Sequence, residues 1–213
     1  MNRPMSAWLE RAGKRFARVA TDASVARPWL WRLFRRPLRA QFDRLAPVWE
    51  QRGGPEALVP LAAALERVET APGRILDLGT GTGKAARVVA RLFRDAAVEA
   101  VDLAPAMVEE AQRLLSGELA GRVHFRVADA SALPYEREAF DLVVLQNMIP
   151  FFDELARVTA PGGAVVIAFS WGPETPIYVP PETLRERLDA VGFGSFEEVA
   201  AGSGSALLAY RIE

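Results

Sequence analysis

The sequence predicts an α/β protein built around a doubly wound, mostly parallel sheet, and three observations predict this fold class. A short apolar run at 74–78 ends in glycines at every second position, and a helical pattern follows at once. Further apolar runs alternate with helical patterns, which is the signature of βαβ units. The chain has 213 residues, 50% of them hydrophobic, which suits one domain with an appendage.

The first 41 residues are predicted to form a basic, tryptophan-rich helical extension. Residues 1–44 contain eleven Arg and Lys against three Asp and Glu, a balance of +8, whereas the remainder contains 15 against 24, a balance of −9. Apolar residues share one helical stripe at 8–19, and a second short helix at 29–36 is expected to end at Pro37.

This extension has three candidate partners. Bulky apolar groups beside arginines are typical of helices on a membrane surface, where each basic residue adds ~1 kcal/mol. Peripheral membrane contact through residues 1–40 and packing on the acidic remainder of the chain stay open, and nucleic-acid binding is unlikely. No run approaches the ~20 apolar residues of a spanning helix, and no signal-peptide core is present. We therefore expect a cytoplasmic protein, either free or peripheral at the membrane.

The glycine-rich stretch at 79–83 is predicted to be a tight turn between the first strand of the sheet and the helix at 84–93. Glycine adopts positive φ and lets a ligand approach the backbone closely. In an open α/β sheet this turn lies at the carboxyl edge, where ligands bind and free helix amides meet negative groups. The turn therefore indicates a nucleotide or nucleoside cofactor.

The spacing of the glycines narrows the choice of cofactor. A P-loop is excluded because only three residues separate Gly79 from Gly83 and because Ala85 follows Lys84 where Ser or Thr is needed. A dinucleotide fingerprint would place its third glycine on Lys84 or Ala86. Alanine is tolerated there, but Gly79 would then have no role. An NAD(P)-linked oxidoreductase is therefore a disfavoured alternative.

The remaining pattern, Asp-x-Gly-x-Gly-x-Gly at 77–83, strongly resembles the first motif of the class I S-adenosylmethionine (SAM)-dependent methyltransferases of small molecules. Further segments that resemble family landmarks lie at 98–107, 127–130, 140–144 and 157–163. The resemblance covers residues 42–213, which we take as the methyltransferase domain. It implies a Rossmann-like, seven-stranded sheet of order 3-2-1-4-5-7-6 with its last strand antiparallel, and SAM as cofactor.

The resemblance also implies a set of cofactor-binding residues. Asp77 would meet the ammonium, Asp102 the ribose hydroxyls and Asp129 the adenine amino group. Asp102 ends the second strand 23 positions after Gly79, close to the ~20-residue spacing of a ribose-binding acid. Capping or turn roles for these aspartates stay open. The full set is Asp77, Gly79, Thr80, Gly81, Thr82, Gly83, Asp102, Leu103, Met107, Asp129, Ala130 and Gln146.

Later elements follow the same plan. The strand at 123–127 alternates apolar and polar residues, which suits a sheet edge and gives His124 a merely exposed position. A helix is expected at 56–69 and another at 181–191. The chain then ends in an expected hairpin of strands 196–200 and 206–212. Such a late hairpin distinguishes this sheet from a dinucleotide-binding one.

The acceptor site is less well defined. Residues 147–150 stand at the family's fourth motif but depart from the Asn/Asp-Pro-Pro-Tyr/Phe of enzymes that methylate planar amines, which disfavours nucleic-acid or glutamine methylation. The segment at 41–50 resembles one that closes over the cofactor in relatives. Candidate substrate residues, each with a packing role as the alternative, are Phe42, Trp49, Asn147, Trp171 and Tyr178.

These observations predict a SAM-dependent methyltransferase, an enzyme that transfers a methyl group to a small or lipid-like acceptor. The alternatives are the NAD(P)-linked oxidoreductase and a catalytically silent SAM-fold binding protein. The sulfonium of SAM is already activated, so binding and orientation, worth ~7–11 kcal/mol in good cases, can suffice, and no catalytic residue is assigned. No metal is expected, since the chain has no cysteine and one histidine.

Overall fold

The computed structural model describes residues 3–52 and 54–212, with side chains from Arg11 onward in these ranges. Seven strands form one sheet of order β3-β2-β1-β4-β5-β7-β6, as predicted. The strands are β1 Arg74–Leu78, β2 Ala97–Asp102, β3 Val123–Val127, β4 Phe140–Gln146, β5 Thr159–Phe169, β6 Phe193–Ala201 and β7 Gly204–Arg211. β7 pairs antiparallel with both of its neighbours, and β1 to β5 pair in parallel, so the predicted fold class is confirmed.

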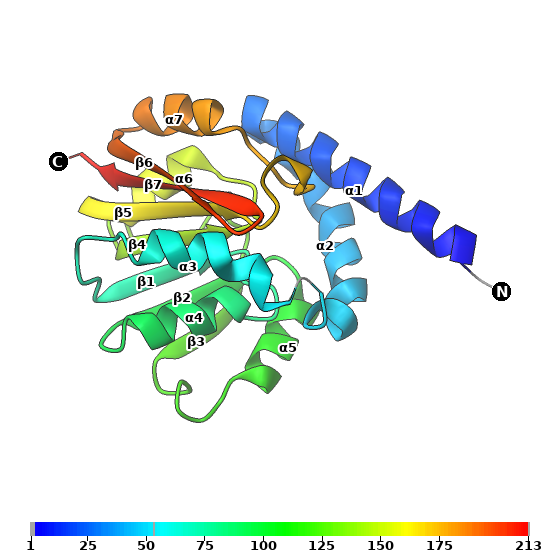
Figure 1. Cartoon of the computed structure of the whole chain (residues 1–213), viewed down its shortest axis with the longest axis horizontal. Helices are drawn as coiled ribbons and strands as arrows, with labels where there is room; N and C mark the ends of the chain where they lie inside the picture. Colours follow the sequence, from blue (N-terminus) through cyan, green and yellow to red (C-terminus); the bar gives the residue numbers. More distant parts are fainter. Residues whose placement is uncertain (1–2, 53, 213) are drawn as a thin grey trace.

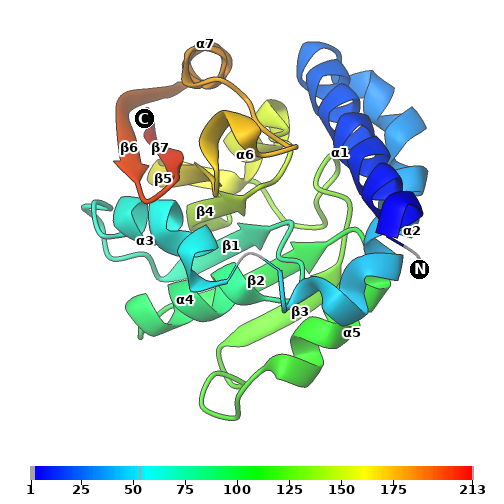
Figure 2. The ribbon, with the colours of Figure 1, turned by 45° about the vertical axis from the view of Figure 1, so that its right-hand side comes forward.

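Helices cover both faces of this sheet and the carboxyl edge of its central strands (Figures 1 and 2). The α-helices are α1 Arg3–Ala26, α2 Trp31–Trp49, α3 Val59–Leu65, α4 Lys84–Leu92, α5 Pro105–Leu114, α6 Phe152–Val158 and α7 Pro181–Asp189. Three short 3₁₀ turns are η1 Pro28–Leu30, η2 Pro55–Leu58 and η3 Gly172–Glu174.

The strands divide their side chains between two apolar cores. Leu76 and Leu78 of β1 point into the core that α6, α7 and the N-terminal helices share, while Ile75 points into the core under α3 and α4. β4 alternates in the same way, because successive side chains of a strand face opposite sides of the sheet. Both faces of the central strands are therefore buried, as a doubly wound sheet requires.

The N-terminal helices pack on the rest of the chain. Ala17, Ala20 and Val25 of α1 and Leu38 of α2 are buried in the core that contains α6 and α7. Beside Ala17 on α1, Arg18 donates to the backbone carbonyls of residues 173, 175 and 178. In the structure, the N-terminal extension therefore packs on the rest of the chain, which was one of its expected partners.

The prediction that Pro37 ends a helix is wrong. α2 continues through Pro37 and Pro47 to Trp49. An interior proline costs a helix ~3 kcal/mol through a lost hydrogen bond and a steric clash. Pro37 is exposed, whereas Trp31, Leu38 and other residues of the opposite face are buried, so burial of that face outweighs the cost. The helix predicted at 56–69 is shorter in the structure. It consists of η2 followed by α3, and α3 ends at Leu65.

The predicted helix at 84–93 and the C-terminal hairpin are confirmed, with ends shifted by up to three residues. β6 and β7 meet at a turn that contains Gly202, whose φ is 58°. Within residues 3–52 and 54–212, no helix combines the length and hydropathy that crossing a bilayer requires.

Candidate functional site

The glycine loop between β1 and α4 forms the centre of the candidate site. Gly79, Gly81 and Gly83 have φ values of 71°, 54° and 81°, a backbone region that other residues rarely adopt. The backbone N–H groups of Gly79 and Thr80 donate to the Val101 carbonyl at 2.9 and 3.0 Å, which ties the loop to β2. The loop lies where the strand order reverses between β1 and β4, the position at which open α/β sheets bind ligands.

Asp77 lies at the base of this loop with no exposed surface. Its Oδ2 accepts from the Thr80 hydroxyl at 2.6 Å, while its Oδ1 has no hydrogen-bond partner within the described residues. Burial raises the pKa of Asp77 to about 7, although the Thr80 hydroxyl and the nearby Ala86 backbone N–H oppose the shift. A buried carboxylate with one free oxygen is expected to attract a cation or a hydrogen-bond donor.

Asp102 ends β2 beside the same loop. Its Oδ2 accepts from the Gly81 N–H at 2.9 Å and its Oδ1 from the Ala104 N–H at 2.8 Å. Withdrawal from water raises the pKa of Asp102 to about 6, and the backbone hydrogen bonds oppose this shift. Each oxygen accepts one bond, so each retains acceptor capacity for a hydroxyl group.

Asp129 lies farther along this edge, after β3, and contacts the N-terminal helices. Its Oδ1 accepts from the Trp31 indole N–H at 2.8 Å and from the Ser131 hydroxyl at 2.7 Å, and its Oδ2 lies 3.3 Å from Arg35 Nη1. Burial alone would raise the pKa of Asp129, but these donors hold it below its ordinary value. The neighbouring Ala130 is buried in the core.

A cavity of about 250 Å³ opens at this end of the site. It is lined by Arg35, Arg36, Arg39, Leu103 and Asp129. Leu103 and Asp129, both predicted cofactor contacts, therefore line one space. The three arginines come from one side of α2, which sequence reasoning did not place at the site.

Aromatic and sulfur-containing side chains cover the loop. A Cβ on Gly81 would lie 3.1 Å from Trp49 Nε1, and a Cβ on Gly79 would lie 2.7 Å from Met148 Sδ. Trp49 packs edge-on against Phe42 with ring centroids 5.5 Å apart, and both rings pack around the buried Met107. Phe42 and Trp49 thus lie over predicted cofactor residues, as a closing segment would.

Polar contacts fasten the end of α2 to the loop. The Glu50 carboxylate accepts from the Thr82 hydroxyl at 2.7 Å and from Arg87 Nη2 at 2.7 Å. Lys84 Nζ donates to the carbonyls of Glu50 and Arg52 at 2.6 and 2.8 Å. Lys84 and Thr82 therefore bind the chain's own covering segment. Glu50 was missed because a glutamate at a helix end carries no signal of its distant partners.

The ends of β4 and β5 are joined by a hydrogen-bonded cluster around Ser170. Asn147, with a φ of 53°, accepts from the Ser170 N–H at 2.9 Å and donates to its hydroxyl at 2.8 Å. Gln146 Nε2 donates to Ser170 Oγ at 2.8 Å and to the Ala57 carbonyl, while Gln146 Oε1 has no partner among the residues described. Asn147 thus shapes the turn that carries Met148 toward Gly79.

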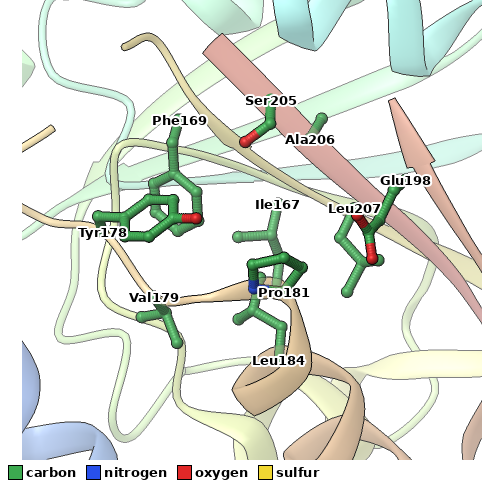
Figure 3. Close-up of a pocket in the computed structure, with 10 residues that line it drawn as sticks. All are labelled: Ile167, Phe169, Tyr178, Val179, Pro181, Leu184, Glu198, Ser205, Ala206 and Leu207. Carbon is green, nitrogen blue, oxygen red and sulfur yellow. The ribbon is translucent and has the colours of Figure 1, made fainter. Parts of the chain in front are cut away.

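The other two candidate substrate residues lie beyond β5. Trp171 is 41% exposed. Tyr178 packs on Phe169 at 5.1 Å between ring centroids and lies under the Arg18 guanidinium. Figure 3 shows Tyr178 and Phe169 beside a space of about 20 Å³. This space is close to the volume that one or two waters need, so it is too small for an organic acceptor.

Within residues 3–52 and 54–212, no group of three His, Asp or Glu residues is arranged to hold a metal ion. The polar groups that converge on the loop are carboxylates and backbone amides at β1 and β2. This donor set suits a ligand with a cationic group and hydroxyl groups.

Comparison with known proteins gives consistent matches. A family model described as a methyltransferase domain matches residues 75–163. A malonyl-[acyl-carrier protein] O-methyltransferase of Halorhodospira halophila is 40% identical over 150 residues, which are 66% of this chain and 50% of that protein. A demethylmenaquinone methyltransferase of Clavibacter sepedonicus is 33% identical over 150 residues, which are 65% of this chain and 60% of that protein. The chain thus spans half or somewhat more of the length of these curated relatives.

A solved structure gives the same fold. The crystal structure of a SAM-dependent methyltransferase from Aquifex aeolicus superposes with a TM-score of 0.61, covering 82% of this chain and 98% of that one at 18% identity. The family match spans the glycine loop and the strands from β1 to β4. Residues 75–163 therefore match a methyltransferase-domain family, and the chain has the fold of a solved SAM-dependent methyltransferase.

Proposed function

We propose that the protein binds SAM at the glycine loop and transfers its methyl group to a small or lipid-like acceptor. The observation that carries the proposal is the buried carboxylate of Asp77, which lies beside three glycines with positive φ. Only one of its two oxygens has a hydrogen-bond partner among the described residues. SAM supplies a methyl group on a sulfonium, already activated for attack. The protein then has to bind and orient the two reactants.

The residues of the loop fit the parts of SAM. In this proposal the free Oδ1 of Asp77 receives the ammonium group, directly or through water. Asp102 uses the remaining acceptor capacity of its oxygens for the ribose hydroxyls, and Leu103 packs on the adenine beside Asp129. Met148 and Trp49 lie over the loop, so both side chains have to shift as the ligand enters.

The class of acceptor rests on the relatives. The names of the two relatives give malonyl-[acyl-carrier protein] and demethylmenaquinone as the molecules on which they act. For the present chain they favour a small or lipid-like acceptor over a nucleic acid.

Calorimetric titration with SAM, S-adenosylhomocysteine and NAD tests the cofactor. We expect saturable binding of the first two ligands and none of NAD. NAD binding without SAM binding would favour the oxidoreductase and overturn the proposal. Transfer of label from methyl-labelled SAM to a metabolite extract then tests the enzyme, since binding without any transfer would favour a silent SAM-fold protein.

We also propose that the protein acts in the cytoplasm and docks on an anionic membrane surface through one face of η1 and α2. Trp29 and Leu33 are 63% and 65% exposed, although both are large and apolar. Arg32 and Arg36 are exposed beside them, four residues apart. Apolar insertion flanked by arginines suits the anionic headgroups of the cytoplasmic leaflet.

Co-sedimentation with phosphatidylglycerol and phosphatidylcholine vesicles tests this contact. Because the N-terminal helices pack on the domain, point variants serve better than truncation. We expect the double variant Trp29→Ser, Leu33→Ser to pellet less with the anionic vesicles than the parent protein. The control Leu92→Ser changes a residue of α4 that is 45% exposed and should pellet as the parent does. Equal pelleting of both variants would remove the proposed surface.

A further inference from the structure

We infer that Trp31 is a positioning residue of the cofactor site, which fixes Asp129 so that this carboxylate selects a base with an exocyclic amino group. The inference rests on the proposed function, because it concerns the adenine end of the same site. It makes the first turn of α2 part of the cofactor site.

Trp31 is itself held firmly. Its side chain is 5% exposed, and its ring packs edge-on against Phe151 with centroids 5.3 Å apart. η1 turns the chain into α2 at this residue, where the Trp31 backbone N–H donates to the Pro28 carbonyl. An indole N–H can only donate, so Trp31 can bind Asp129 only through a carboxylate oxygen that accepts.

The two oxygens of Asp129 differ in their partners. Oδ1 accepts from the Trp31 indole at 2.8 Å, from the Ser131 hydroxyl at 2.7 Å and from the Ser131 backbone N–H at 3.0 Å. Three donors use the acceptor capacity of this oxygen. Among the described side chains, Oδ2 has one polar contact, with Arg35 at 3.3 Å, and the Arg35 side chain is 45% exposed. Oδ2 is therefore the oxygen left to accept from a ligand.

The cavity beside Asp129 sets the shape of that ligand. At about 250 Å³ it lies just below the ~300–1,000 Å³ of sites for drug-sized molecules, which suits a single base. Leu103 provides an apolar wall, and the arginines of α2 provide guanidinium groups that can stack on an aromatic ring. An amino group donates to a carboxylate, whereas a carbonyl at the same ring position would meet it acceptor to acceptor.

This arrangement predicts discrimination between adenine and its deaminated form. A site built to hydrogen-bond a donor rejects the analogue that lacks it, because a buried acceptor is then left unpaired. Trp31 contributes by binding one carboxylate oxygen, which fixes the plane of the carboxylate and keeps the second oxygen directed at the cavity. Loss of the indole N–H should therefore weaken adenine binding more than binding of the deaminated base.

The test compares Trp31→Phe, which keeps an aromatic ring against Phe151 but removes the N–H, with the control Trp29→Phe at an exposed position. Titrations use S-adenosylhomocysteine and S-inosylhomocysteine, its deaminated form. We expect Trp31→Phe to bind the adenosyl ligand about five- to twentyfold more weakly, with little change for the inosyl ligand. The control should retain the discrimination of the parent protein.

Two results would overturn the inference. Equal weakening of both ligands would mean that Trp31 only supports the fold, and unchanged affinity for both ligands would mean that it does not position Asp129. Failure of the parent protein to bind either ligand would instead refute the proposed function, and the inference with it. If Trp31→Phe does not fold, Ser131→Ala removes another donor to the same oxygen and should reduce the discrimination in the same direction.

Discussion

The Thr80 hydroxyl donates to the Asp77 carboxylate at 2.6 Å inside the turn that carries the three glycines. Both residues are buried, and the bond uses only one carboxylate oxygen. The bond orients the carboxylate but only partly offsets the cost of removing its charge from water. The pKa of Asp77 therefore remains raised to about 7. The charge of Asp77 therefore changes within the ordinary working range of pH.

Cofactor affinity should fall as the pH is lowered through 7. A protonated Asp77 has to release its proton before it can pair with an ammonium group, so affinity should drop by up to about tenfold per pH unit below 7. Titration calorimetry with S-adenosylhomocysteine from pH 5.5 to 8 measures this effect. Asp77→Asn is the control, because it retains any titration of the ligand itself. Parallel profiles for the two proteins would contradict the assignment.

The stability of the free protein should show the opposite trend for this residue. Burial raises the folded-state pKa of Asp77 from 3.8 to about 7, so the folded state keeps the proton to higher pH than the unfolded state does. This contribution is present below about pH 4 and is lost as the pH rises to 7, at up to ~1.4 kcal/mol per unit. In urea unfolding, the free energy of unfolding of Asp77→Asn should therefore rise relative to that of the parent protein between pH 5 and 8. A constant difference would argue against the raised pKa.

Asp102→Ala should weaken SAM binding by ~1–3 kcal/mol, because ribose hydroxyl groups in the site would lose a charged acceptor. The side chain also holds the Gly81 and Ala104 amides, so thermal unfolding without ligand is needed beside the titration. Asp102→Asn keeps one acceptor oxygen and should lose less affinity. Full SAM affinity in a folded Asp102→Ala protein would show that the ribose lies elsewhere.

Gly83→Ala should destabilise the protein by at least ~2 kcal/mol. The residue has a φ of 81°, and a Cβ would lie 2.7 Å from Phe125 Cζ, so both backbone strain and a displaced ring contribute. Gly117→Ala is the matched control, since a Cβ there meets nothing within 4 Å. Its stability should be unchanged or slightly raised. Similar losses for both variants would disprove this account of the loop.

Glu50→Gln should cost about 1 kcal/mol of unfolding free energy, because the side chain bridges Thr82 and the largely buried guanidinium of Arg87. Glu110→Gln is a matched control, since Glu110 also pairs with an arginine, but that arginine has a side chain 67% exposed and the pair lies within one helix. Chemical unfolding should detect a loss only for the Glu50 variant. Equal losses would mean that the contact with the loop adds nothing beyond an ordinary ion pair.

Local sequence patterns were sufficient to predict the sheet and the loop. The apolar run at 74–78, the glycines that follow it and the acid at Asp102 each have short-range signatures, and the structure brings Asp102 to the loop at Gly81. The strand order came from the family resemblance and is confirmed. The binding roles of the loop residues stay predictions until a ligand is measured.

The parts that could not be predicted depend on contacts between distant segments. Pro37 is an unfavourable helix residue locally, and only burial of the opposite face explains why α2 continues through it. Asn147 was predicted to contact the methyl acceptor. In the structure its side-chain amide instead bonds to Ser170, 23 positions away, and stabilises a turn. The domain boundary predicted at residue 41 stays a prediction, although α2 crosses it without a break.

The unbroken course of α2 has a kinetic consequence. Its 19 residues extend over ~28 Å, with Trp31 bound to Asp129 near one end, Asp43 bound to the Ala106 N–H midway and Trp49 over Gly81 at the other end. Because these three contacts lie on one helix, we expect the two ends of the site to open together. Exchange of spent cofactor for fresh should therefore proceed at the rate at which the whole helix lifts, and that rate sets an upper limit on turnover.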